Sequence, residues 1–150
     1  MNLTMQKGFT LAEVLIAAMV VAIALCGLIA TYVGCFNTIA VSKNTNIAMN
    51  YAQGLMEQIR NTPFPQIPNF AYAAAVPIFT QLGILSSTIV YVDNTNPELL
   101  RVTISVCWKQ KNRVFGEDNN LNGVLNAGED TNGNGIIDSP AEIVALIANR

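Results

Sequence analysis

Histidine is missing from this chain of 150 residues, and cysteine occurs only three times. Without histidine, Ser–His and Cys–His catalysis is excluded, and ordinary zinc sites are not expected. Cys26 lies inside a hydrophobic run, where a small apolar packing role is expected. Cys35 and Cys107 are candidates for a disulfide in an oxidising compartment, and the sequence does not decide whether they meet.

Charge is also scarce, at 12 % of the residues, with a net charge of −2. Its distribution is uneven, because six of the ten acids lie within residues 117–142, which contain no Lys or Arg. These acids are Glu117, Asp118, Glu129, Asp130, Asp138 and Glu142. The pattern suggests a cation site and argues against nucleic-acid binding, which requires a basic face. No nucleophile–base pair is visible, so we do not expect an enzyme.

The first quarter of the chain is dominated by a hydrophobic run. Residues 9–36 contain a single charge, Glu13, and no proline. At about 1.5 Å per residue, a helix of this length crosses a bilayer core of roughly 30 Å. The apolar stretch is too long for a secretory signal, and a carboxylate inside a membrane helix suggests a functional partner.

The residues around this acid carry a resemblance. The run Lys7-Gly8-Phe9-Thr10-Leu11-Ala12-Glu13-Val14 resembles the processing site of type IV pilins and pseudopilins. The resemblance implies that a prepilin peptidase cleaves between Gly8 and Phe9 and methylates the new amine. Glu13 then becomes the fifth mature residue, which this family uses to meet the N-terminal amine of a neighbouring subunit. Such an ion pair would give Glu13 a partner in the filament core.

The resemblance implies a structural subunit of a type IV pilus or type II secretion pseudopilus, held in the inner membrane with its head outside the cytoplasm before assembly with other subunits. Ala30 stands where many major pilins carry a proline, and residues 48–61 and 100–108 are loosely similar to minor subunits. We therefore expect a minor subunit. The alternative is a single-pass membrane-anchored extracytoplasmic calcium-binding protein that does not polymerise.

The rest of the chain predicts an α+β fold. We expect a leader at 1–8, a transmembrane or filament-core helix at 9–36, an amphipathic continuation at 37–61, and a β-rich head at 62–150. Ile47, Tyr51, Leu55 and Ile59 recur at helical spacing and form a stripe that should pack on a small antiparallel sheet. Residues 37–46 are weakly helical, so a bend is a candidate feature there.

Three segments of the head predict strands. Residues 100–109 alternate between apolar and polar side chains, which indicates one buried and one solvent-facing side, with Trp108 capping the core. Residues 88–93 form a second strand, joined to the first by turn-forming residues 93–97. Residues 142–148 contain enough β-branched side chains to favour a third strand. Residues 70–85 show no clear period.

The acidic insert, residues 117–142, contains a calcium-loop pattern, D-x-[DN]-x-[DN]-G-x5-E. Asp118, Asn120 and Asn122 supply side-chain oxygens, Val124 a carbonyl and Glu129 two more oxygens. Calcium is the cation expected for an oxygen set of this spacing. We expect it to order a segment too polar to fold by burial alone.

A second, shorter loop begins at the next residue. Its expected ligands are Asp130, Asn132, Asn134, the carbonyl of Ile136, and Asp138. Ala141 occupies its twelfth position and offers no side-chain oxygen, so Asp138 or Glu142 is expected to complete the set. Some pseudopilins also hold calcium in a C-terminal loop, which the resemblance extends to this insert. A flexible turn without metal is the alternative.

Overall fold

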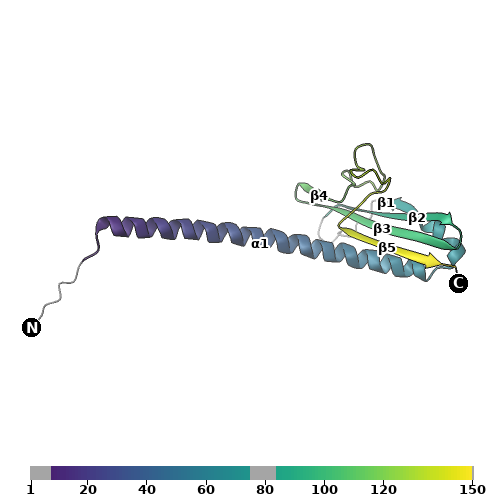
Figure 1. Ribbon diagram of the computed structural model, residues 1–150, viewed down its shortest axis with the longest axis horizontal. Helices are drawn as coiled ribbons and strands as arrows, with labels where there is room; N and C mark the ends of the chain where they lie inside the picture. The colour runs from purple at the N-terminus through teal and green to yellow at the C-terminus, as the bar shows by residue number, and fades with distance from the viewer. Residues whose placement is uncertain (1–7, 75–83, 150) are drawn as a thin grey trace, which may run out of the picture. The chain divides into compact units, whose positions relative to one another are not determined.

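The computed structural model describes residues 8–74 and 84–149. It contains the helix α1 (Leu11–Arg60), the 3-10 helix η1 (Phe64–Phe70) and strands β1 (Tyr72–Ala74), β2 (Ser86–Asn96), β3 (Leu99–Gln110), β4 (Arg113–Phe115) and β5 (Ala141–Ala148). Figure 1 shows these elements in order. The expected α+β class, with a long N-terminal helix and a small antiparallel sheet, is confirmed. The chain divides into a first unit up to Ala40 and a second unit from Val41.

Helix α1 extends almost over the range predicted. It continues through residues 37–46, so the weak helical signal there does not interrupt it. It ends at Arg60, three residues before Pro63, which is consistent with the loss of a backbone donor at proline. In the first unit every described side chain up to Ile39 is exposed. Within the described residues, α1 is the one helix long and apolar enough to cross a membrane.

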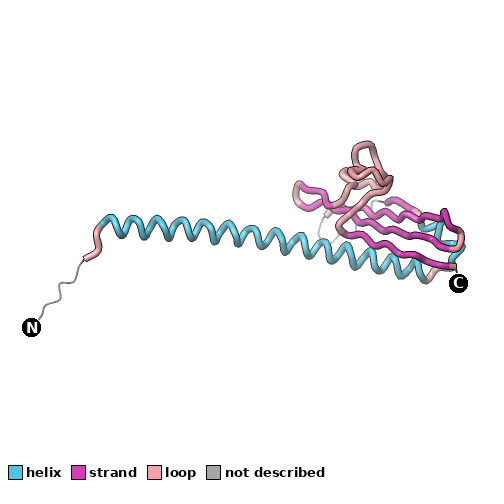
Figure 2. The backbone as a smooth tube through the Cα atoms, in the orientation of Figure 1, coloured by secondary structure: helices cyan, strands magenta, loops and turns pink. Residues whose placement is uncertain are grey.

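The sheet is antiparallel, with the strand order β1-β2-β3-β4, and β5 also pairs with β3. Strands β2 and β3 form the predicted hairpin, which is irregular between Asp93 and Asn96. Strand β5 occupies one edge of β3 from Leu99 to Val106, and β4 continues that edge from Trp108. The predicted third strand is therefore confirmed, and β3 is the centre of the sheet, since it pairs with β2 along one edge and with β4 and β5 along the other. Figure 2 draws the strands in magenta.

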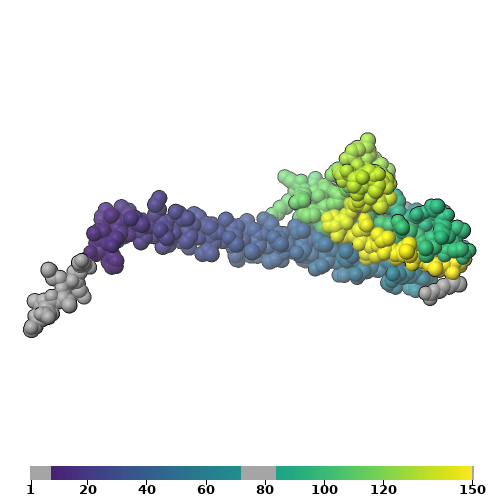
Figure 3. All heavy atoms as spheres, viewed as in Figure 1, coloured from purple at the N-terminus to yellow at the C-terminus, as the bar shows by residue number. Residues whose placement is uncertain are grey.

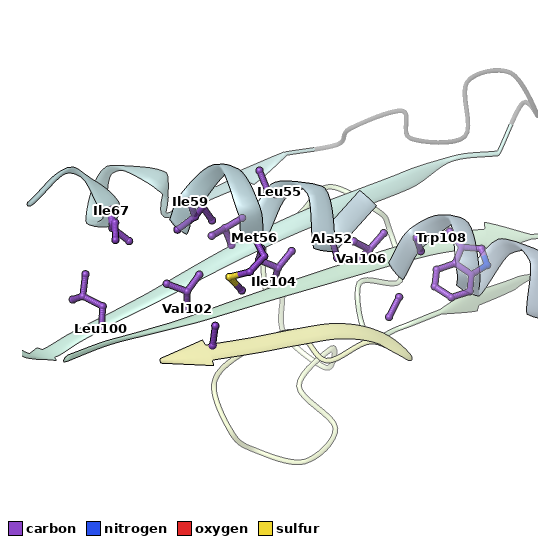
Figure 4. Packing of buried hydrophobic residues seen from close by; sticks show 14 residues of the cluster. Ala52, Leu55, Met56, Ile59, Ile67, Leu100, Val102, Ile104, Val106 and Trp108 are labelled. Atoms are coloured by element: carbon purple, nitrogen blue, oxygen red, sulfur yellow. The ribbon is translucent and has the colours of Figure 1, made fainter. Parts of the chain in front are cut away.

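The main core of the second unit lies between α1 and one face of the sheet. Helix positions with 3- and 4-residue spacing are buried, which is the stripe expected of an amphipathic helix. Figure 4 shows these side chains facing alternate residues of β3. The set includes Ala52, Leu55, Met56, Ile59, Val102, Ile104, Val106 and Trp108. Trp108 is fully buried, which confirms its predicted place in the core.

The other face of β3 differs from the prediction. Thr103, Ser105 and Cys107 were expected to face solvent, yet they are 5 %, 0 % and 0 % exposed. They are covered because the insert folds back over this face, where Leu121 and Ile137 form a second cluster with Cys107. The insert therefore contributes its own apolar residues to the head.

Candidate functional site

The first candidate site is the start of α1. Gly8, Phe9 and Thr10 precede the helix and are exposed, and Phe9 is 88 % exposed. Thr10 and Glu13 form a reciprocal cap. The Glu13 backbone N–H donates to Thr10 Oγ1 (3.2 Å), and Glu13 Oε2 accepts from the Thr10 N–H (3.0 Å). The Thr10 hydroxyl donates to the same oxygen at 3.1 Å.

This arrangement is a capping box, in which a threonine and a glutamate three residues later satisfy two backbone donors of a helix start. Only one carboxylate oxygen of Glu13 is used in it. A carboxylate accepts about four hydrogen bonds, so Glu13 keeps acceptor capacity for a further cationic partner. The expected processing residues and the expected assembly residue thus lie within one exposed stretch of six residues, 8–13.

The second candidate site is the insert, which forms the compact yellow-green projection in Figure 3. Its first loop closes around the carboxylate of Asp118, which is fully buried. Asp118 Oδ1 accepts from the Asn122 N–H (3.2 Å), and Oδ2 accepts from the Gly123 N–H (2.7 Å). Oδ2 also accepts from the Ser87 hydroxyl on β2 at 2.5 Å. The loop is thereby fastened to the sheet.

Three amide side chains meet in this first loop. Asn120 Nδ2 and Asn122 Nδ2 donate to Asn126 Oδ1 at 2.7 Å and 3.0 Å. The side-chain oxygen of Asn122 accepts from the Val124 N–H at 2.7 Å. The predicted ligands at positions three and five are therefore brought together with the residue at position nine.

The second loop repeats this arrangement. The Asp130 carboxylate accepts from the N–H groups of Gly133 (2.7 Å) and Gly135 (2.9 Å). The side-chain nitrogens of Asn132 and Asn134 donate to Asp138, which is the ninth residue of its loop just as Asn126 is of the first. The Ile136 N–H donates to Asn134 Oδ1 at 2.9 Å, matching Val124 and Asn122.

Glu129, the twelfth residue of the first loop, joins the two ends of that loop. Its Oε1 accepts from the Asn119 N–H at 3.0 Å, and its Oε2 accepts from the Asn126 N–H at 2.9 Å. These donors are the second and ninth residues of the loop. Glu129 is 5 % exposed, so its carboxylate depends on these bonds in place of water.

Glu117 has the same role in the second loop. Its Oε1 accepts from the Thr131 N–H and its Oε2 from the Asp138 N–H, each at 3.1 Å, and these donors are again the second and ninth residues. The Thr131 hydroxyl donates to it as well. This hydroxyl and the two N–H groups lower the pKa of Glu117 against the opposing effects of burial and Asp130. Each glutamate directly precedes the aspartate that opens a loop, and each completes the other loop.

The sequence-based expectation named Asp138 or Glu142 to complete the second loop and did not include Glu117. Glu142 instead accepts from the Ser105 hydroxyl at 3.0 Å, and burial raises its pKa. The missed signal was the repetition of Glu-Asp at 117–118 and 129–130. Among the described residues, no three Asp, Glu, Cys or His side chains are grouped in a way that could hold a metal ion. Asparagine and backbone oxygens supply the remaining acceptors of the loops.

None of the three cysteines is among the residues predicted for either site. Cys26 and Cys35 are exposed on α1, and Cys107 is buried in the second unit; all three are free thiols. Gly116 lies against Cys107, with a φ of +106° that favours glycine. The candidate Cys35–Cys107 disulfide is not formed in this structure.

Comparison with protein families gives one match. The prokaryotic N-terminal methylation motif matches residues 3–31, which include Gly8, Phe9 and Glu13. Neither curated proteins nor solved structures give a match. The chain therefore carries the leader motif of type IV pilins, and its long N-terminal helix with a small sheet is pilin-like. The motif implies processing by a prepilin peptidase and points to a structural subunit.

Proposed function

With the methylation motif as the premise, we propose that this protein is a minor structural subunit of a type IV pilus or a type II secretion pseudopilus. The observation that carries the proposal is the pairing of that motif with an apolar helix whose side chains from Leu11 to Ile39 are exposed. Such a surface requires lipid or other apolar helices around it. A membrane and then a filament core supply these in turn.

Assembly would use the charge created by processing. Cleavage after Gly8 turns the Phe9 amide into an amine, and Glu13 offers the carboxylate that such an amine requires. In an apolar surrounding both charges are costly alone, and pairing offsets much of that cost. The pair would also fix the axial register of one subunit against the next.

The test is mass spectrometry of the N-terminal peptide from membranes that contain a prepilin peptidase. We expect an N-methylated Phe9 start, and an uncut leader in Gly8→Val. Gly27→Val is the matched control, because Gly27 lies inside α1, away from the cleavage site, and like Gly8 has nothing within 4 Å of an added Cβ. An intact Met1 or Met5 start in the unmodified chain would favour the anchored, non-polymerising alternative.

A second measurement separates assembly from processing. Glu13→Gln should be cleaved like the parent and yet be strongly depleted from sheared filaments of a host with the cognate machinery. Glu57→Gln removes a carboxylate from the exposed side of the same helix and serves as the control. Equal incorporation of both variants would contradict the proposed pairing.

We also propose that the insert binds calcium. The donor set fits this ion, because it consists of carboxylate, amide and carbonyl oxygens without sulfur or imidazole. Asp118, Asn120, Asn122, Val124 and Glu129 would hold one ion, through side chains and the Val124 carbonyl. Turning a side-chain amide by 180° exchanges its oxygen and nitrogen, so the converging asparagines can present oxygens. When bound, calcium would supply positive charge to cross-link the loop.

The second loop would use Asp130, Asn132, Asn134, the Ile136 carbonyl and Asp138. Glu117 is the proposed acid at the place where Glu129 serves the first loop. The many neutral asparagines lower the charge of both loops, so we expect extracellular-grade dissociation constants, on the order of 10⁻⁴–10⁻³ M.

The test uses the full chain in detergent, with calorimetric titration of calcium and limited proteolysis with and without chelator. Calcium should slow cleavage within residues 117–142, and Glu129→Gln should remove most of that protection. Glu98→Gln removes the same charge from an exposed turn and should retain it. No heat of binding and unchanged proteolysis would overturn the calcium proposal and leave the filament proposal intact.

A further inference from the structure

The basic residues of the second unit are concentrated at one end of its sheet. Lys109, Lys111 and Arg113 lie around the β3–β4 turn, and all three are exposed. No acidic residue occurs from Trp108 to Gly116. Together with Lys43 on α1, these side chains make up half of the eight basic residues in the chain. We call this set the basic tip.

A hydrogen bond places the turn beside α1. Asn44 Nδ2 donates to Gln110 Oε1 at 3.0 Å, and Asn44 is only 5 % exposed. Lys43 immediately precedes it and is exposed. Lys43 is also the only charged residue between Glu13 and Glu57. The end of the sheet that carries the turn is therefore the end next to the first residues of the second unit.

Of the basic tip, Lys43 follows the apolar run closely in the sequence. Lys43 is seven positions after Phe36, where that run ends. Seven helical residues span about 10 Å, and a headgroup layer extends roughly 6 Å beyond the hydrocarbon core. A lysine or arginine side chain can bridge the remaining distance. A membrane that holds the apolar run therefore lies within seven residues of Lys43 along the chain.

We propose that the basic tip binds anionic phospholipid headgroups of the leaflet from which α1 emerges, before the subunit enters a filament. The partner is chosen by charge complementarity and by the short stretch of chain between the tip and the membrane. Glu117, the nearest acid after Arg113 in the sequence, belongs to the insert, where its carboxylate accepts hydrogen bonds from Thr131 and Asp138. The inference rests on the proposed membrane-held state.

Binding of the basic tip to anionic headgroups would orient the head while the subunit is held in the membrane before assembly. Each basic side chain at an anionic surface favours contact by about fivefold. The contact would be lost on extraction of the helix, because the tip then leaves the lipid surface. Salt would weaken it by screening.

The experiment uses the full chain with Cys26→Ala, Cys35→Ala and Asn112→Cys, spin-labelled in the exposed turn and reconstituted in vesicles. A trace of lipid with a nickel-chelating headgroup reports contact by collisional relaxation. The nickel does not bind the protein through imidazole, because the chain contains no histidine. Vesicles of phosphatidylcholine are compared with vesicles that also contain phosphatidylglycerol.

We expect faster relaxation with phosphatidylglycerol, a return to the phosphatidylcholine rate in high salt, and a partial return in Lys109→Gln/Lys111→Gln. Loss of two charges should lower the contact equilibrium by roughly 25-fold. Arg60→Gln/Arg101→Gln removes two charges away from the tip and should keep the effect. Relaxation that is independent of lipid charge in an inserted protein would overturn this inference alone. Failure of the protein to insert would instead refute the membrane-held state. The salt series on the labelled parent tests the same charge dependence without any charge variant, so it applies even if a variant fails to fold.

Discussion

The hydroxyl of Ser87 donates to the carboxylate of Asp118 across 2.5 Å, and both residues are fully buried. This bond joins the central hairpin of the sheet to the first loop of the insert. Among the described residues, Ser87 is the only side-chain donor to the Asp118 carboxylate. The other two donors are the backbone N–H groups of Asn122 and Gly123 in the loop itself.

Ser87→Ala should therefore destabilise the head by about 1–3 kcal/mol, because a buried charged acceptor loses a partner that water cannot replace. Urea unfolding of the full chain in detergent measures this change. Ser42→Ala, at an exposed position of α1, is the control and should stay within about 0.5 kcal/mol. Equal effects of the two substitutions would show that the bond contributes nothing specific.

Gly116→Ala should lower the stability of the head strongly for so small a substitution. An added Cβ would lie 2.3 Å from Cys107 Sγ, and the φ of +106° is unfavourable for alanine. Overpacking and backbone strain of this kind each cost about 1–3 kcal/mol. Thermal or urea unfolding provides the measurement.

Gly54→Ala is the matched control for this prediction. Gly54 lies inside α1, and nothing is within 4 Å of its added Cβ. Removing a helical glycine stabilises by about 0.5–1 kcal/mol. The two substitutions should therefore change stability in opposite directions, and a stabilised Gly116→Ala variant would refute the described packing.

Stability should depend on Glu117 at acid pH. The folded-state pKa of Glu117 is lowered from 4.5 by the Thr131 hydroxyl and the neighbouring N–H groups. Ionised Glu117 therefore contributes to the free energy of unfolding above about pH 4.5, the pKa of the unfolded state. This contribution is lost as the pH falls from there through the lower pKa of the folded state. Glu117→Gln should flatten this part of the curve of unfolding free energy against pH.

Glu98→Gln, in an exposed turn, is the charge-matched reference for this series. Glu142 acts in the opposite sense. Burial raises its pKa, so ionisation of Glu142 as the pH rises lowers the free energy of unfolding. An unchanged acid slope in Glu117→Gln would contradict the bonds described for the second loop.

Cys107 should be unreactive in the folded protein. Burial raises the pKa of its thiol to about 11, and the thiolate is the reactive form. A water-soluble maleimide at pH 8 should label Cys107 only after unfolding, as read by peptide mass spectrometry. A thiol introduced at Asn112, in the exposed β3–β4 turn, should react rapidly under the same conditions. Comparable labelling at both positions would contradict the described burial.

The elements were predictable from the sequence because each has a local signature. The apolar run and the stripe through Ile59 specify α1, and the alternation from Leu100 to Trp108 specifies β3. The environment of Thr103 and Ser105 was not predictable in this way. Their small polar side chains satisfy the alternation of a solvent-facing strand side, yet both are buried on the face of β3 where Cys107 packs against the insert.

In the candidate sites, too, local features were predictable from the sequence and features that depend on distant residues were not. The capping box at Thr10 and Glu13 and the ligand spacing of the first loop are local patterns that the sequence displays. The role of Glu117 is not local, because this residue precedes the first loop and yet accepts hydrogen bonds from the second. A pattern scanned one loop at a time assigns Glu117 to neither.

The position of Glu117, outside the loop that it completes, limits how this insert can change in length or be moved to another protein. The second loop taken alone loses the acid that joins its ends, because that acid, Glu117, precedes the first loop. Residues 117–138 therefore form the smallest portable block. A one-residue insertion between the two glutamates would disturb both loops together. Insertions and deletions that preserve the fold of the insert should accordingly occur outside this block, or should add or remove a whole calcium-loop pattern.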